Sequence, residues 1–257
     1  MNQDSLQYRE KKQFFESLLT IYGRKPVLEA LQDKSLNIYK LHFADSNKTS
    51  GIINDITKLA EQRGIEIQYH DKKALSRISK NGKQDQGVAA DIELDYQQSL
   101  EHFIDNNVKH SYQLIALDRI TNPQNLGMII RSVCAGNIDG LIIPRQGCAA
   151  LSSLVIKAST GTLFKAPIIS CEKLEDGIVK LAETGADICA LSSHAQQSLF
   201  SYKTTAPTVY ILGNETDGVS ENIFKHCNQR LRIPMSNGVE SLNVAITAAL
   251  IAFKDVE

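Results

Sequence analysis

Three segments in the C-terminal half of the chain combine polar side chains with turns, in patterns that could form a ligand site. In the first, LDRITNPQNLGMIIRS, a predicted strand ends at Asp118, and a helix follows with Asn125 in its entry turn and Arg131 on its second turn. Their directions on a helix need not coincide, but Asn125 in the entry turn can still face the same crevice. The local sequence equally fits a simpler interpretation, in which Asn125 caps the helix and Arg131 forms a surface ion pair.

The second segment, VYILGNETDGVS, is an apolar strand that runs into a loop with Gly213, Glu215 and Gly218. Glycines let the backbone approach a ligand closely, so the segment has the form of a binding loop. A plain strand-to-helix turn with Glu215 solvated near the next helix is an equally good interpretation. Neither G-x-G-x-x-G nor G-x-x-x-x-G-K-[ST] occurs, which removes the usual support for NAD binding and nucleotide hydrolysis.

The third segment is LRIPMSNGVESLNVAITAALIAF, in which a short strand turns through Pro234 and Asn237-Gly238. Ser241 or Asn243 then caps a helix that is apolar almost all round, and such a helix is expected to be buried. A capped core helix explains 244–253, but it does not explain why small polar residues stand on both sides of Leu242.

The elements that must position these segments alternate between strands and helices from residue 112 onward. Strands are predicted over 114–117, 140–143, 166–169, 187–191, 208–212 and 230–233, and helices over 124–135, 151–159, 173–183 and 243–253. This order predicts an α/β fold, a mostly parallel sheet with helices on both faces. Ligands in such sheets bind in loops beyond the carboxyl ends of the strands, where the first two segments lie.

The N-terminal part reads as a second, smaller α/β unit over 21–95, preceded by an extension over 1–20 that is a leading helix or a partly ordered arm. Residues 96–111 are polar and fit a linker to the domain over 112–257. The stretch KKALSRISKNGKQDQG brings five basic residues together with no acid between them. By itself such a stretch is usually a solvated face.

Composition restricts the classes of function. Lysine and arginine total 28 against 29 acidic residues, so any RNA site must be a local patch. The five cysteines form no C-x-x-C pair and the six histidines no H-x-x-x-H pair, so we expect a reduced, cytoplasmic protein without a metal site. The charged start does not fit a signal peptide, and no apolar run approaches the ~18 residues of a membrane span.

Taken together, the segments NLGMIIR, GNETDG, and IPM with SLNV resemble the ordered motifs of the SpoU/TrmH family of SPOUT methyltransferases. The segments IYGRKPVLEAL and GKQDQGVAADI resemble that family's N-terminal, ribosomal-protein-like RNA-binding domain. The resemblance implies a trefoil-knotted catalytic domain, S-adenosylmethionine as methyl donor, a homodimer, and 2'-O-methylation of ribose in structured RNA. The two-domain layout favours ribosomal RNA over transfer RNA as the substrate.

The resemblance also assigns roles to individual residues. The residues that it implies for catalysis are Asn125, Arg131, Glu215, Ser241 and Asn243. Those that it implies for cofactor binding are Leu191, Ser192, Ser193, His194, Leu212, Gly213, Asn214, Gly218, Ile233, Met235 and Leu242. The basic residues that we expect to bind RNA are Arg24, Lys25, Lys72, Lys73, Arg77, Lys80 and Lys83.

Because a guanidinium stays protonated, Arg131 is expected to clamp a phosphate and stabilise the developing oxyanion rather than to act as a base. Asn125, Ser241 and Asn243 would orient the ribose, and Glu215 would fix either Arg131 or its own loop. Two alternatives compete with this hypothesis. One is a noncatalytic RNA-binding or ribosome-assembly protein on the same fold, and the other is a small-molecule enzyme on a doubly wound fold.

Overall fold

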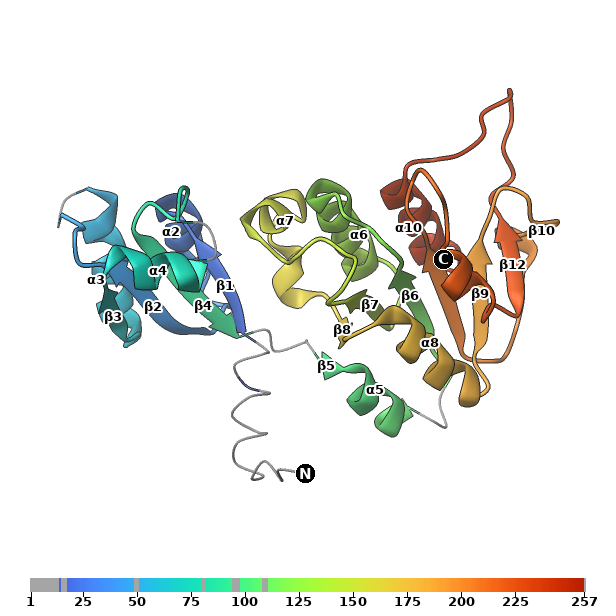
Figure 1. The fold of residues 1–257 in the computed structure, drawn as a ribbon, viewed down its shortest axis with the longest axis horizontal. Coiled ribbons are helices and arrows are strands. Elements are labelled where there is room, and N and C mark those ends of the chain that lie inside the picture. The colour runs from blue at the N-terminus through green and yellow to red at the C-terminus, as the bar shows by residue number, and fades with distance from the viewer. Residues whose placement is uncertain are drawn as a thin grey trace. The chain divides into compact units, whose positions relative to one another are not determined.

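The computed structural model describes residues 14, 18–48, 51–79, 82–93, 98–107 and 111–256. The chain divides into two compact units, Met1–Asp95 and Tyr96–Glu257 (Figure 1). Within the described ranges, no helix is both long and apolar enough to cross a membrane.

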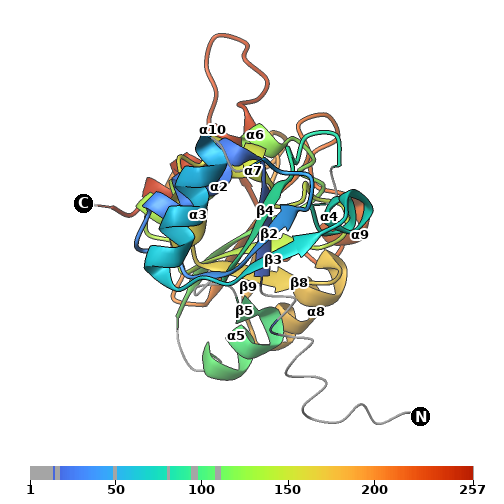
Figure 2. The same cartoon turned by 90° about the vertical axis from the view of Figure 1, so that its left-hand side faces the viewer.

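The N-terminal unit is a four-stranded sheet with helices on both faces (Figure 2). Its strands are β1 (Leu18–Tyr22), β2 (Ile38–Ala44), β3 (Ile67–His70) and β4 (Val88–Glu93), in the order β1-β4-β2-β3. Its helices are α2 (Arg24–Gln32), α3 (Ile52–Arg63) and α4 (Lys72–Ser79). Strand β4 runs antiparallel to both of its neighbours, whereas β2 and β3 are parallel.

Two elements of this unit differ from the sequence-based expectation. Leu18–Tyr22 forms strand β1, not part of a helix or arm, because Leu19 and Ile21 alternate with half-exposed neighbours and pair with the buried strand β4. The basic stretch begins with helix α4, which buries Leu75 while its basic side chains stay exposed. The rest of the predicted extension, 1–13 and 15–17, lies outside the described residues.

The C-terminal unit confirms the predicted parallel sheet. Eight parallel strands stand in the order β10-β12-β9-β11-β6-β7-β8-β5. Their bounds are β5 (Gln98–Ser99), β6 (Gln113–Leu117), β7 (Gly140–Pro144), β8 (Ile168–Cys171), β9 (Asp187–Leu191), β10 (Gln197–Ser198), β11 (Thr208–Leu212) and β12 (Gln229–Arg232). The helices are α5 (Leu100–Asn107), α6 (Pro123–Ala135), α7 (Ser153–Ala158), α8 (Leu174–Glu183), α9 (Glu221–Phe224) and α10 (Val244–Phe253), with short 3-10 turns over Thr162–Lys165 and Leu199–Ser201.

The two faces of this sheet pack against different helices. Leu114 and Ala116 of β6 share one apolar cluster with residues of α5, α8 and α9. Ile115 and Leu117 are also fully buried, and because side chains alternate along a strand they point to the other face, where α6 and α10 lie (Figure 1). Helices therefore cover both faces of the sheet, and the loops that follow the strands lie beyond its carboxyl edge.

Residues 98–107 do not form a linker, contrary to the expectation. Strand β5 pairs with β8 at the edge of the large sheet, and α5 follows it directly. Leu100 and Phe103 are buried in the core, and the Phe103 ring lies edge-on to Tyr112 with 5.2 Å between centroids. Leu100 and Phe103, one helical turn apart, anchor this otherwise polar stretch together with Ile104.

Helix α10 is only partly buried in this chain. It packs along α6, and Ala248 and Ile251 are buried there, but Ile246 and Phe253 are 51% and 46% exposed. The expectation of a fully buried helix is therefore wrong for the single chain. One side of α10 covers the sheet and α6, and nothing within the described part of the chain covers the other.

Candidate functional site

The site begins where two neighbouring parallel strands end. β6 and β11 pair in register, with Leu117 beside Leu212. The loop after β6 starts with Asp118, whose buried carboxylate accepts a hydrogen bond from the backbone N–H of Ser220, 2.6 Å away, at the end of the loop after β11. The adjacent strand ends therefore bring the first two motif segments together, as the topology predicts.

Asn125 is a buried residue that does not cap its helix. The cap of α6 is Asn122, whose Oδ1 accepts from the backbone N–H of Gln124 at 2.8 Å. The side chain of Asn125 is therefore free to point elsewhere, and its Nδ2 donates to the Glu215 carboxylate. Its Oδ1 accepts from Nδ2 of Asn243 at 3.2 Å. The simpler interpretation of Asn125 as a cap is wrong.

Asn243 joins the third motif segment to the other two. Its Oδ1 accepts from the backbone N–H of Ala245 at 2.8 Å and so caps α10, which decides between it and Ser241 as the cap. Its Nδ2 reaches Asn125 across 118 positions of sequence. These three side chains form a continuous series of hydrogen bonds, from Glu215 through Asn125 to Asn243, which restricts their rotamers.

Arg131 and Ser241 stand apart from this hydrogen-bonded chain. Arg131 lies on the exposed side of α6, and no hydrogen bond or ion pair to it is found in the described part of the structure. The structure thus pairs Glu215 with Asn125 rather than with Arg131. Ser241 is exposed in the segment before α10 and lines the cavity described next.

A cavity of about 450 Å³ lies among the loops that follow β9, β11 and β12. Its lining contains all eleven residues that the sequence analysis assigns to the cofactor, together with Glu215 and Ser241. The lining residues that the sequence analysis did not single out are Thr216, Asp217, Val219, Phe224, Glu240, Val244 and Thr247. All of them except Phe224 lie within the second and third segments of the sequence analysis, so position in those segments is the signal that could have indicated them.

The cavity lining combines apolar side chains with carboxylates. Leu191, Leu212 and Ile233 contribute apolar surface, and Glu215, Asp217 and Glu240 contribute carboxylates. No lysine or arginine appears in the described lining. A cavity of this size and composition suits a small organic ligand that carries positive charge.

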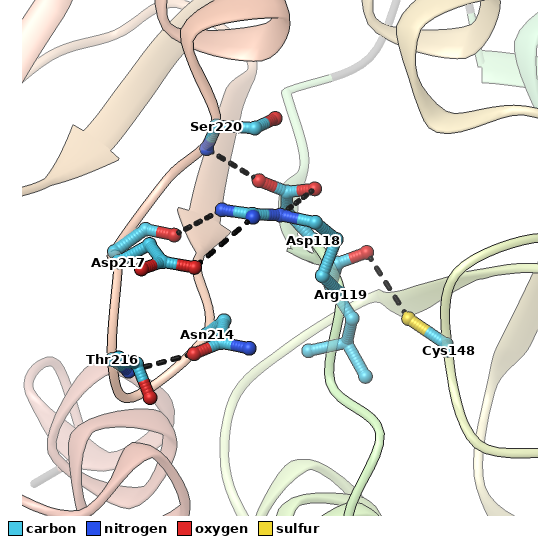
Figure 3. Close-up of polar contacts among 9 residues, drawn as sticks. Asp118, Arg119, Cys148, Asn214, Thr216, Asp217 and Ser220 are labelled. Atoms are coloured by element: carbon cyan, nitrogen blue, oxygen red, sulfur yellow. Dashed lines mark hydrogen bonds and ion pairs between the residues drawn. The ribbon is translucent and has the colours of Figure 1, made fainter.

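Gly213 lets the loop after β11 fold back on itself. A Cβ at this position would stand 2.1 Å from the carbonyl carbon of Gly218 and 2.2 Å from the backbone nitrogen of Val219. Asn214 and Gly218 form a β-bridge, and Oδ1 of Asn214 accepts from the N–H of Thr216 at 2.6 Å (Figure 3). The tight turn is therefore built on close approach of the loop backbone to itself, whereas the sequence analysis expected this glycine to allow close approach to a ligand.

The buried thiols of this unit are not activated as nucleophiles. Burial raises the pKa of the Cys148 thiol and raises those of Cys171 and Cys189 to about 12, so these thiols stay protonated and are poor nucleophiles. Among the described residues, no group of three histidine, cysteine, aspartate or glutamate side chains could hold a metal ion.

The N-terminal unit has a second cavity, of about 630 Å³, lined in part by Arg24, Lys72 and Lys83. Lys25, Lys73 and Arg77 are exposed but do not line it, and Lys80 lies outside the described residues. No ion pair engages any of these six side chains in the described ranges. Asp85 also lines this cavity, but it is buried and accepts hydrogen bonds from the Ser79 hydroxyl and the Gly87 N–H.

Two protein-family models match this chain, one for each of its two compact units. The model of the SpoU rRNA Methylase family matches residues 112–253, and that for RNA 2'-O ribose methyltransferase substrate binding matches residues 20–97. A protein named 23S rRNA (guanosine-2'-O-)-methyltransferase RlmB, from Xylella fastidiosa, is 28% identical over 239 residues, covering 92% of this chain and 95% of that protein. An uncharacterized tRNA/rRNA methyltransferase of Mycolicibacterium smegmatis is 28% identical over 90% of this chain and 74% of its own.

A solved structure shares the fold. The SpoU methyltransferase AviRb from Streptomyces viridochromogenes, in complex with the cofactor AdoMet, superposes with a TM-score of 0.61 at 22% identity, over 97% of this chain and 92% of that one.

Proposed function

This chain belongs to the SpoU rRNA methylase family, and we propose that it methylates a ribose 2'-hydroxyl of 23S ribosomal RNA. Family membership makes the protein an RNA ribose 2'-O-methyltransferase that depends on S-adenosylmethionine. The choice of 23S RNA rests on relatives that carry this activity in their names and align with this chain over almost their whole length. Transfer RNA is the second candidate, because other relatives are named tRNA/rRNA methyltransferases.

The observation that carries the proposal is the cavity beside the chain of hydrogen bonds from Glu215 through Asn125 to Asn243. We assign this cavity to S-adenosylmethionine, which supplies a methyl group activated by a sulfonium charge. The volume of about 450 Å³ falls within the roughly 300 to 1,000 Å³ of small-molecule sites. The three carboxylates of the lining favour a ligand with net positive charge.

The residues around the cavity have distinct parts in methyl transfer. A ribose hydroxyl is a poor nucleophile, so its oxygen must be held in line with the methyl group while its proton leaves. Asn125 and Asn243, fixed by Glu215 and by the cap of α10, together with Ser241, are proposed to orient the ribose. Arg131 would bind a neighbouring phosphate and stabilise negative charge on the oxygen, since it has no competing partner in the described structure.

RNA docking is proposed for the basic cavity of the N-terminal unit. Arg24, Lys72 and Lys83 line it without carboxylate partners, so their charges are available to RNA phosphates. The same unit matches the substrate-binding family model. Lys25, Lys73 and Arg77 are exposed on the same unit and would add to this basic surface.

A homodimer is proposed from the apolar surface of α6 and α10. Met128 on α6 is 42% exposed, and Ile246 and Phe253 on α10 are 51% and 46% exposed. The two helices pack against each other, so their exposed apolar residues belong to one side of the unit. A second copy of the chain would remove this surface from water, as isologous interfaces do.

We place the protein in the cytoplasm, where its RNA substrate is.

The proposal is tested by transfer of labelled methyl from S-adenosylmethionine to total RNA from a strain that lacks the gene. We expect label in the large-subunit RNA, and about 100-fold less with Arg131→Ala or Asn125→Ala. Arg131→Ala should still bind S-adenosylmethionine, because Arg131 does not line the cavity and forms no hydrogen bond or ion pair in the described structure. Asn125→Ala also removes the bond to Glu215 in the lining, so Arg131→Ala is the variant that isolates methyl transfer from donor binding. A protein that binds both S-adenosylmethionine and RNA yet labels no fraction would instead be a noncatalytic RNA-binding protein.

A further inference from the structure

Arg119 has an unusual backbone conformation at the edge of the cavity. It follows Asp118 at the end of β6, and its φ of 59° lies in the left-handed region that non-glycine residues rarely adopt. Such a conformation costs free energy and persists where the surroundings require it, often at functional sites.

The Arg119 guanidinium spans the gap to the loop that follows β11 (Figure 3). One terminal nitrogen donates to the carbonyl oxygen of Gly218 at 3.1 Å, and the other lies 3.4 Å from the Asp217 carboxylate. Nε is buried without a hydrogen-bond partner, 3.6 Å from a carboxylate oxygen of Asp118. The guanidinium therefore lies between the carboxylate of Asp118, on the loop after β6, and that of Asp217, on the loop after β11.

Both residues that Arg119 contacts on this loop, Asp217 and Gly218, line the cavity assigned to S-adenosylmethionine. Asn125 holds the same loop at Glu215, and Asp118 holds its far end at the Ser220 N–H. The contact with Arg119 lies between these two.

We infer that Arg119 is a positioning residue that holds the loop 213–218 in the conformation that binds the methyl donor. The inference rests on the proposed function, because it takes the cavity as the donor site. An arginine suits this place because its planar fork reaches a carbonyl and a carboxylate at once, whereas a lysine ammonium on a flexible stem does not fix both.

The test compares variants that separate backbone strain from side-chain contacts. Arg119→Gly removes the contacts and adopts the left-handed conformation without strain, and its unfolding transition shows whether the variant folds. We expect ~10-fold weaker S-adenosylmethionine binding by calorimetry, and a smaller loss in Arg119→Lys. Thr160→Gly is the matched control, since Thr160 has a φ of 50° and does not line the cavity. It should bind as the wild type does.

Hydrogen exchange gives a readout that does not depend on the ligand. Without S-adenosylmethionine, peptides over 213–220 should exchange faster in Arg119→Gly, because the Gly218 N–H bond to Asn214 and the Ser220 N–H bond to Asp118 loosen. Asp217→Asn should reproduce part of this effect, and adding it to Arg119→Gly should change little further.

The outcomes separate the two claims. Wild-type exchange over 213–220 in Arg119→Gly, or faster exchange with unchanged donor affinity, would overturn the positioning role while leaving the methyltransferase proposal intact. If the wild-type protein fails to bind S-adenosylmethionine, the proposed donor site is wrong, whatever the exchange of the loop shows.

Discussion

Replacing Gly213 with alanine tests whether the turn after β11 must be as tight as the structure shows. The new Cβ would stand 2.1 Å from the carbonyl carbon of Gly218 and 2.2 Å from its oxygen. These are backbone atoms, so they cannot rotate away as a side chain would. Gly218 is also fixed by its bridge to Asn214. Ordinary contact distances are regained only if one side of the turn moves by about 1 Å.

A shift of that size has a calculable consequence. A displacement of about 1 Å at a catalytic site can cost roughly 100-fold in rate, which corresponds to about 2.7 kcal/mol of activation free energy. The moving loop carries Glu215, which orients Asn125. We therefore expect kcat/KM for methyl transfer to fall about 100-fold. Overpacking should also lower the free energy of unfolding by about 1 to 3 kcal/mol.

The assay is the initial rate of methyl transfer to RNA over a range of S-adenosylmethionine concentrations. Gly185→Ala is the matched control: Gly185 has a φ of 86°, and a Cβ there would meet nothing within 4 Å. The control should lose stability through backbone strain, yet keep wild-type kinetics because it lies outside the cavity lining. The reasoning is refuted if Gly213→Ala, folded as judged by its unfolding transition, methylates RNA at the wild-type rate.

Three further predictions concern RNA binding, assembly and pH. Lys72→Ala should weaken RNA binding about equally for all sequences, and in filter binding it should reduce the slope of log affinity against log salt by about one. An unchanged slope would show that Lys72 does not contact an RNA phosphate. Ile246→Glu should place a charge on the exposed face of α10 and convert a dimer to a monomer in sedimentation, whereas a wild-type monomer would contradict the proposed interface. Burial and the charge of His42 lower the pKa of His70 below 6.5, so the unfolded chain takes up the proton first and stability falls as pH drops below 6.5. In Asp91, burial raises the pKa, but hydrogen bonds from His42 and Thr20 outweigh it and lower the pKa below 3.8, so its stabilising effect is lost only below that pH. His70→Gln should therefore flatten the decline that begins near pH 6.5 in urea unfolding curves of the full chain, and an equally steep decline would contradict this.

The sequence predicted best where a short apolar run has clear polar boundaries. Strands β9 and β11 have the predicted bounds, because their apolar runs between polar segments are too short for core helices. The sequence analysis missed strand β1 and the structure of residues 98–107. Both become structured by pairing with strands distant in sequence, β4 and β8. The trefoil knot stays a prediction of the family resemblance.

For the site, the sequence likewise predicted which residues gather but not how they contact one another. Motif resemblance gave eleven of the residues that line one cavity, but it did not give their contacts. Pro123 at the first helical position is a local signal that Asn122 is the cap. The bond from Asn125 to Glu215 crosses 90 positions of sequence, and no local pattern predicts that partner. Arg119 was missed because its left-handed conformation leaves no trace in a run of ordinary loop residues.

The central claim is that the three motif segments form one site that methylates a ribose oxygen. Its most direct test is mass spectrometry of nucleosides from 23S RNA of the deletion strain, after incubation with the purified protein and S-adenosylmethionine. We predict one nucleoside in which the added methyl mass stays with the sugar when the base is released. A methyl mass on the base, or none on any nucleoside although the protein binds both S-adenosylmethionine and the RNA, would contradict the claim.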